Sequence, residues 1–135
     1  MEQITLKTQR INKQIDKTEI NPLTGGIILR STWKGKLAGN QTKVIKSGVA
    51  IHIPEGYYGL VVNSTNIVEN YPFLLRTQTI TTEDREEIIL YVVNYSPYPE
   101  GINLNQKVGE ILIHPIQPVA HKGVAKISAF KTEEK

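Results

Sequence analysis

The stretch TITTEDREEI, residues 79–88, gathers four carboxylic acids within five positions: Glu83, Asp84, Glu86 and Glu87. A carboxylate can act as a general base when its pKa suits the working pH and it lies within hydrogen-bond reach of the proton it removes. Apolar runs on both sides place the stretch in a loop between two strands. The residues alone leave three interpretations open: a catalytic loop, the remains of one, or a solvated turn.

Other catalytic and metal chemistry has little support in the sequence. The chain has no cysteine, which excludes disulfides and thiolate metal sites. His52, His114 and His121 lack close metal-ligand spacing, and the first two lie in strand patterns, so we interpret them as structural. Neither a nucleophile elbow nor a phosphate-binding loop is present. We therefore expect no metal and no cofactor.

The elements that must position these acids have strand patterns. Apolar residues alternate over 49–53, as in a strand with one buried face. The runs 88–95 and 111–116 are apolar almost throughout, which predicts strands buried on both faces. Turn residues separate the runs. The pattern predicts an all-β barrel or sandwich with at most one short helix, over residues 64–71.

Length and composition favour one intracellular domain. A chain of 135 residues can bury one sizeable core. The N-terminus is polar, unlike a signal peptide, and no stretch reaches the roughly 18 apolar residues of a membrane helix. We expect a domain over 1–120, a mobile C-terminal arm over 121–135, no membrane association, and a location in the cytoplasm or in a virion.

Two stretches resemble the trimeric dUTP diphosphatases of the dUTPase and dCTP deaminase superfamily. GVAIHIPEGYYGLVV (48–62) is similar to the segment that leads into the family's second motif. GINLNQKVGEILIHPI (101–116) is similar to the fourth motif and its strand. The order and spacing agree over roughly residues 22–119. The resemblance implies a distorted, jelly-roll-like β-barrel that assembles as a homotrimer.

The chemistry of that family is not retained at the aligned positions. Its first motif has an aspartate where this chain has Ile28. Its second motif offers an arginine and a serine to the phosphates, and the aligned residues are Asn63 and Ser64. A neutral amide cannot replace the charged fork with which arginine grips phosphate oxygens.

The third and fourth motifs depart in the same way. Aligned on Ile80, the position of the family's general base is Thr81, and its sugar-stacking tyrosine is replaced by Asp84. A hydroxyl without a partner base cannot activate water near neutral pH. The glutamine of the fourth motif is Glu110, which would repel a phosphate. The glycine-rich arm that closes over the nucleotide has no counterpart in the tail.

These departures favour a non-catalytic protein on a dUTPase scaffold. We expect a trimeric structural or protein-interaction component, encoded by a virus or mobile element, that binds an unidentified protein as a virion component or host-factor binder. One alternative is a divergent dUTP or dCTP hydrolase with Glu83 or Glu87 as base, which would need Mg²⁺ with the substrate's phosphates. A second alternative is a nucleotide or nucleic-acid binder that uses a basic patch of Lys34, Lys36, Lys43 and Lys46.

Overall fold

The computed structural model describes residues 3–63 and 72–126, and within them every regular element is a β-strand. The all-β prediction is confirmed, and the helix predicted over 64–71 lies outside the described residues. The strands are β1 (Lys7–Arg10), β2 (Ile27–Arg30), β3 (Gly35–Leu37), β4 (Thr42–Lys46), β5 (Val49–His52), β6 (Tyr57–Val62), β7 (Phe73–Leu75), β8 (Gln78–Ile80), β9 (Ile89–Asn94), β10 (Glu100–Ile102) and β11 (Lys107–Pro115).

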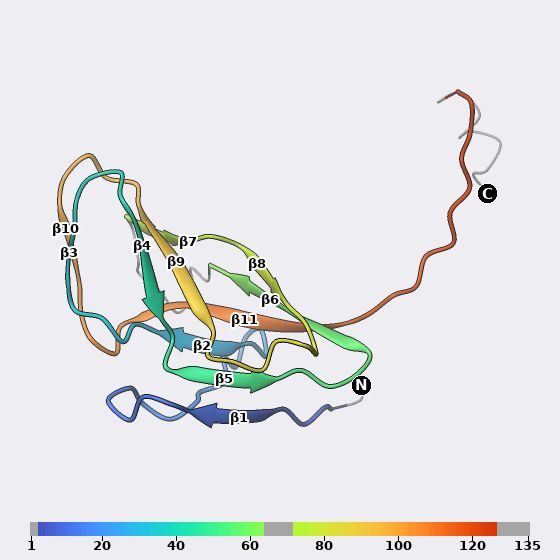
Figure 1. Cartoon of the computed structure of the whole chain (residues 1–135), viewed down its shortest axis with the longest axis horizontal. Coiled ribbons are helices and arrows are strands. Elements are labelled where there is room, and N and C mark those ends of the chain that lie inside the picture. The colour runs from blue at the N-terminus through green and yellow to red at the C-terminus, as the bar shows by residue number, and fades with distance from the viewer. Residues whose placement is uncertain (1–2, 64–71, 127–135) are drawn as a thin grey trace.

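The strands form four antiparallel sheets. The largest has the order β2-β11-β6-β8, the next is β4-β9-β7, and β1-β5 and β10-β3 are two-stranded. The β10-β3 ribbon lies at one end of the molecule, and the segment that follows β11 leaves at the other (Figure 1). The described strands therefore wrap around a shared core without one continuous ring of backbone hydrogen bonds.

The core is aliphatic and lies between the sheets. Its fully buried members include Leu29, Ile51, Val61, Leu90 and Ile111, one from each of five strands. Burial of such side chains stabilises the fold by about 1.5–3 kcal/mol each. The core thus joins the elements on either side of the acidic loop.

Two strands differ in detail from the sequence prediction. In β9 one face is buried and the other is half-buried, so the prediction of burial on both faces was wrong for this strand. The reason is that its second face is the outer face of the three-stranded sheet β4-β9-β7. β11 begins four positions earlier than predicted, at Lys107, and is buried on both faces over 108–111. It lies between β2 and β6.

The ends of the described chain differ from each other. Residues 11–24 contain only an isolated bridge, Ile20 with Ile27, yet they fold back onto the body. Residues 116–126 form no strand and are mostly exposed, extending from the body after a hydrogen bond from the Ile116 N–H to the Gly56 carbonyl (Figure 1).

The domain boundary at residue 120 stays a prediction. No described residue belongs to a helix with the length and apolarity to cross a membrane.

Candidate functional site

The first half of the acidic loop is a tight turn held by its own side chains. The Asp84 carboxylate accepts a hydrogen bond from the Thr81 N–H (2.7 Å) and another from the Thr81 hydroxyl (3.1 Å). The Thr81 hydroxyl also accepts from the Glu83 N–H (3.3 Å), and the Asp84 N–H donates to the Thr81 carbonyl (3.1 Å). Thr81 and Asp84 therefore stabilise the turn that follows β8.

The second half of the loop is tied to the start of β5. The Glu87 carboxylate accepts a hydrogen bond from the Gly48 N–H (2.7 Å), and Gly48 has a positive φ of 77° that favours glycine. Glu83 and Glu86 are exposed, and they line an open hollow of about 440 Å³ beside β8 and β9. Two of the four acids thus hold the loop, and two face solvent.

Ile28 and Glu110 lie opposite each other on neighbouring strands. The register pairs Ile28 of β2 with Glu110 of β11. Directly opposite residues of an antiparallel pair project from the same face of the sheet. A Cβ built on Gly26, which shares this face, would collide with a carboxylate oxygen of Glu110, so the glutamate side chain lies across it. Ile28 is 6% exposed and Glu110 is 1% exposed.

This face is covered by residues 15–24, which we call the N-terminal cover. Glu110 accepts hydrogen bonds from the Asn21 amide (3.1 Å) and from the Thr24 hydroxyl. The Ile28 N–H donates to the carbonyl of Glu19, another residue of the cover (2.9 Å). The carboxylate of Glu110 is thus directed into the molecule and has its hydrogen-bond partners there.

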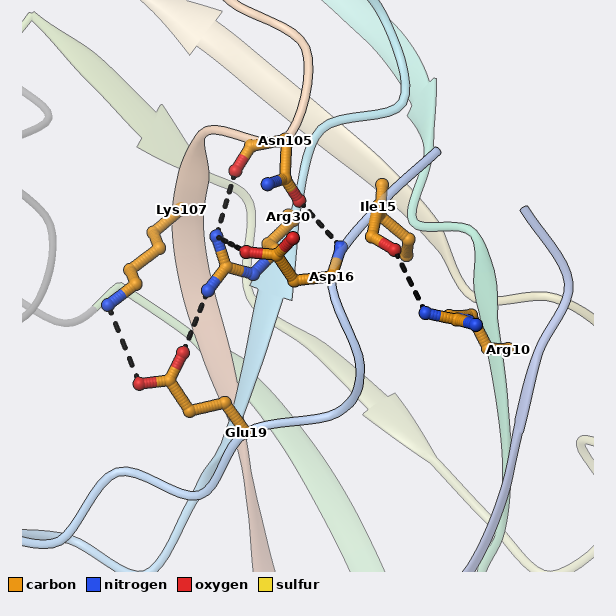
Figure 2. Close-up of polar contacts among 7 residues, drawn as sticks. All are labelled: Arg10, Ile15, Asp16, Glu19, Arg30, Asn105 and Lys107. Atoms are coloured by element: carbon orange, nitrogen blue, oxygen red, sulfur yellow. Dashed lines mark hydrogen bonds and ion pairs between the residues drawn. The ribbon is translucent and has the colours of Figure 1, made fainter. Parts of the chain in front are cut away.

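A polar cluster fastens the N-terminal cover to β2 and β11 (Figure 2). The Arg30 guanidinium, 11% exposed, contacts the carboxylates of Asp16 (3.6 Å) and Glu19 (2.7 Å) and donates to the Asn105 carbonyl (3.0 Å). The Asn105 side chain accepts from the Asp16 N–H (2.8 Å), and Lys107 pairs with Glu19 (3.6 Å). A half-buried arginine fork with several acceptors fixes geometry better than an isolated surface pair.

Asn63, the aligned residue of the second motif, also has a structural contact. Its amide donates to the Leu75 carbonyl (3.1 Å) and accepts from the Leu75 N–H (2.7 Å). This two-way bridge joins the end of β6 to β7 and occupies both polar ends of the side chain. Ser64 lies outside the described residues.

The predicted basic patch is divided between surfaces. Lys43 and Lys46 are three positions apart in β4, so their side chains leave opposite faces of the strand. The Lys43 ammonium lies over the Trp33 ring, 4.8 Å from its centroid. Lys36 projects outward from β3, which belongs to a different sheet, and Lys34 precedes that strand. The four lysines therefore do not form one continuous patch.

The described residues do not offer a magnesium site of their own. No group of three or more histidine, aspartate or glutamate side chains lies close enough, within residues 3–63 and 72–126, to hold a metal ion. The His114 ring lies against the Tyr58 ring (centroids 5.6 Å apart), and His52 is exposed on β5. Mg²⁺ prefers several oxygen ligands, so in a hydrolase on this fold most of them would have to come from the substrate's phosphates and from water.

Comparison with known proteins adds one curated relative and a group of solved structures. No protein-family model matches the chain. A deoxyuridine 5'-triphosphate nucleotidohydrolase of Anaplasma marginale (strain St. Maries) is 25% identical over 92 residues, which is 67% of this chain and 63% of that protein. The match therefore spans less than two thirds of that relative.

Phage dUTPases have a similar structure. The dUTPase of Staphylococcus bacteriophage 80alpha, solved as a variant with dUpNHpp, has a TM-score of 0.76 at 19% identity, over 91% of this chain and 97% of that one. The dUTPase of phage phi11 of S. aureus has a TM-score of 0.75 at 20% identity, over 94% and 100%. Such values at such low identity establish a common fold and leave the activity open.

Proposed function

The chain has the fold of the dUTPases, and from this premise we propose that it is a non-catalytic member of that fold. It acts as a homotrimeric structural or protein-interaction component, encoded by a virus or mobile element. It works in the cytoplasm or in the virion, where its surfaces bind a protein partner.

The N-terminal cover is the observation that carries the proposal. The resemblance assigns Ile28 and Glu110 to motifs that serve the nucleotide in the dUTPases. Here both side chains lie beneath residues 15–24 of the same chain, and Arg30 and Glu110 both bind to that segment. A nucleotide could reach this face only if the N-terminal cover were displaced, which would leave the Glu110 carboxylate without its two partners.

The acidic loop supports the same conclusion. The position aligned with the general base is Thr81, whose hydroxyl donates to the Asp84 carboxylate and is engaged in holding the turn. Water activation requires an acceptor of suitable pKa within hydrogen-bond reach. The loop has a turn in place of that acceptor.

Exposed apolar side chains support a role in protein association. On the outer face of the β4-β9-β7 sheet, Val44 is 57% exposed and Leu74 is 42% exposed. Apolar groups that adjoin on one sheet face indicate an interaction surface more strongly than scattered ones. A related phage enzyme is described as controlling the transfer of virulence genes by a proto-oncogenic G protein-like mechanism, so action through a partner has a parallel on this fold.

Turnover of dUTP and dCTP by the purified protein with Mg²⁺ tests the proposal. We expect release of diphosphate at the rate of a protein-free control. Turnover above that control would overturn the non-catalytic assignment. Light scattering in the same buffer should give about three times the chain mass of 15.2 kDa, and a monomer would overturn the trimer.

A divergent hydrolase is the second candidate, because Glu83 is exposed at the open hollow and free to meet a water. Glu87 is the weaker base, since its carboxylate already binds the Gly48 N–H. If turnover is found, E83Q should abolish it if Glu83 is the base. E87Q should abolish it if Glu87 is the base, and should also lower the free energy of unfolding, because the bond to the Gly48 N–H is weakened. Nucleic-acid binding through Lys34, Lys36, Lys43 and Lys46 would appear as affinity that falls steeply with salt.

A further inference from the structure

A hollow between β1, β5 and the acidic loop is lined by three basic side chains. Lys7 of β1, His52 of β5 and Arg85 of the loop border an open space of about 270 Å³. The other residues that line it are uncharged, so no carboxylate borders this hollow. The three basic residues are far apart in the sequence, and only the fold brings them together.

The strand register fixes two of the three. Lys7 pairs directly with His52 in the β1-β5 ladder, so both side chains leave the same face with Cβ atoms roughly 5 Å apart. Arg85 directly follows the turn that the Asp84 carboxylate closes by accepting from the Thr81 N–H. This turn fixes the backbone position of Arg85. All three side chains are exposed, and none makes an ion pair or hydrogen bond with another residue in the described part of the chain.

Lys7 and Arg85 are cations without an ion-pair partner among the described residues, and they border one hollow and repel each other. An anion would relieve the repulsion. Arginine offers a planar fork that matches phosphate oxygens, lysine offers a compact charge, and imidazole offers a ring N–H. We propose that the hollow bordered by Lys7, His52 and Arg85 binds a small phosphate-bearing ligand.

The neighbouring hollow limits the size of that ligand. It shares His52 and Arg85 but is also bordered by Glu55 and Glu83. An extended polyanion would cross these two carboxylates, whereas a single phosphate group can stay among the three basic residues. The site therefore selects inorganic phosphate or a phosphomonoester over a nucleic acid. This inference stands apart from the proposed function, because binding here involves neither Ile28 nor Glu110.

Calorimetric titration of the full chain, at constant ionic strength set with sodium chloride, tests the proposal. The two probes are inorganic phosphate and glycerol 3-phosphate, and the tighter one identifies the source of the phosphate group. R85Q should weaken binding at least tenfold. E83Q should strengthen it severalfold, because a nearby negative charge is removed. K13Q is the matched control, an exposed cation in the segment after β1 that does not line the hollow, and should bind as the unchanged protein does.

A second readout locates the ligand. In amide NMR spectra, phosphate should shift the signals of Lys7, His52 and Arg85 and leave those of β3 unchanged. Circular dichroism confirms that each exposed substitution leaves the fold intact. Absence of saturable binding by either probe would overturn the proposal. So would equal affinity in R85Q and K13Q, or tighter binding of single-stranded DNA than of both probes with the same R85Q dependence.

Discussion

The covered face of β2 predicts that introducing at position 28 the aspartate of the first dUTPase motif destabilises the protein. The substitution is Ile28→Asp. It replaces an aliphatic side chain that is 6% exposed and places a second carboxylate opposite Glu110. Because the N-terminal cover excludes solvent from both side chains, neither charge is screened well.

The expected cost has two parts. Loss of a buried isoleucine removes about 1.5–3 kcal/mol of apolar stabilisation. Two carboxylates roughly 5 Å apart repel each other by about 3 kcal/mol at an effective dielectric constant of about 20. The sum, about 5 kcal/mol, approaches the total stability of many domains, which is about 5–15 kcal/mol. We expect Ile28→Asp to be barely folded and to show no dUTP turnover.

Urea unfolding followed by the fluorescence of Trp33, the single tryptophan, measures these terms at one fixed protein concentration. Ile28→Asn is the matched control, since it has the same shape without the charge. Aspartate should cost about 3 kcal/mol more than asparagine in the natural background. The difference should largely vanish once Glu110→Gln is added, because the repelling charge is gone. Equal costs for aspartate and asparagine in the natural background would refute the reasoning.

Four further substitutions test other features of the structure. Arg30→Leu should cost about 1–3 kcal/mol and speed amide exchange in residues 15–19 but not in β9, and uniform exchange would contradict the role of Arg30 in fastening the N-terminal cover. Asp84→Ala removes the acceptor that closes the loop turn and should cost about 0.5–1.5 kcal/mol, whereas an unchanged melting temperature would show that the turn is stable without it. Gly56→Ala should cost about 1–2 kcal/mol from its positive φ alone, since a Cβ there meets nothing within 4 Å. Gly48→Ala should cost at least about 1 kcal/mol more, because its Cβ would lie 2.7 Å from a side-chain carbon, and equal costs would show that the site relaxes freely.

Local patterns were sufficient to predict the fold class. Alternation over 49–53 and the apolar runs at 88–95 and 111–116 correspond to β5, β9 and β11, because side-chain period and β-branched content are local properties of a strand. The extra length of β11 was missed, since Lys107, Gly109 and Glu110 are not residues that typify a strand. Their burial depends on β2, β6 and the N-terminal cover, none of which is adjacent in sequence.

The sequence indicated candidate positions for a site but not the environment of their side chains. The resemblance pointed to Thr81 and Asp84, and the structure shows them bound to each other. It did not indicate that Glu110 would be buried, because its partners Asn21 and Thr24 lie in a segment that reads as a polar loop. The grouping of charges around Arg30 depends on long-range contacts, so no spacing rule could have found it.

The contacts of the N-terminal cover also set an order of events during synthesis. The bond from Asp16 to Asn105 and the bond from Asn21 to Glu110 each span 89 positions. Contacts of such separation form late and slow the folding of β-rich chains. Residues 15–24 therefore emerge from the ribosome long before β11, one of the two strands that they bind. Until residue 110 has been made, this segment has only its contacts with β2, at Ile28 and Arg30, so its protection is completed last.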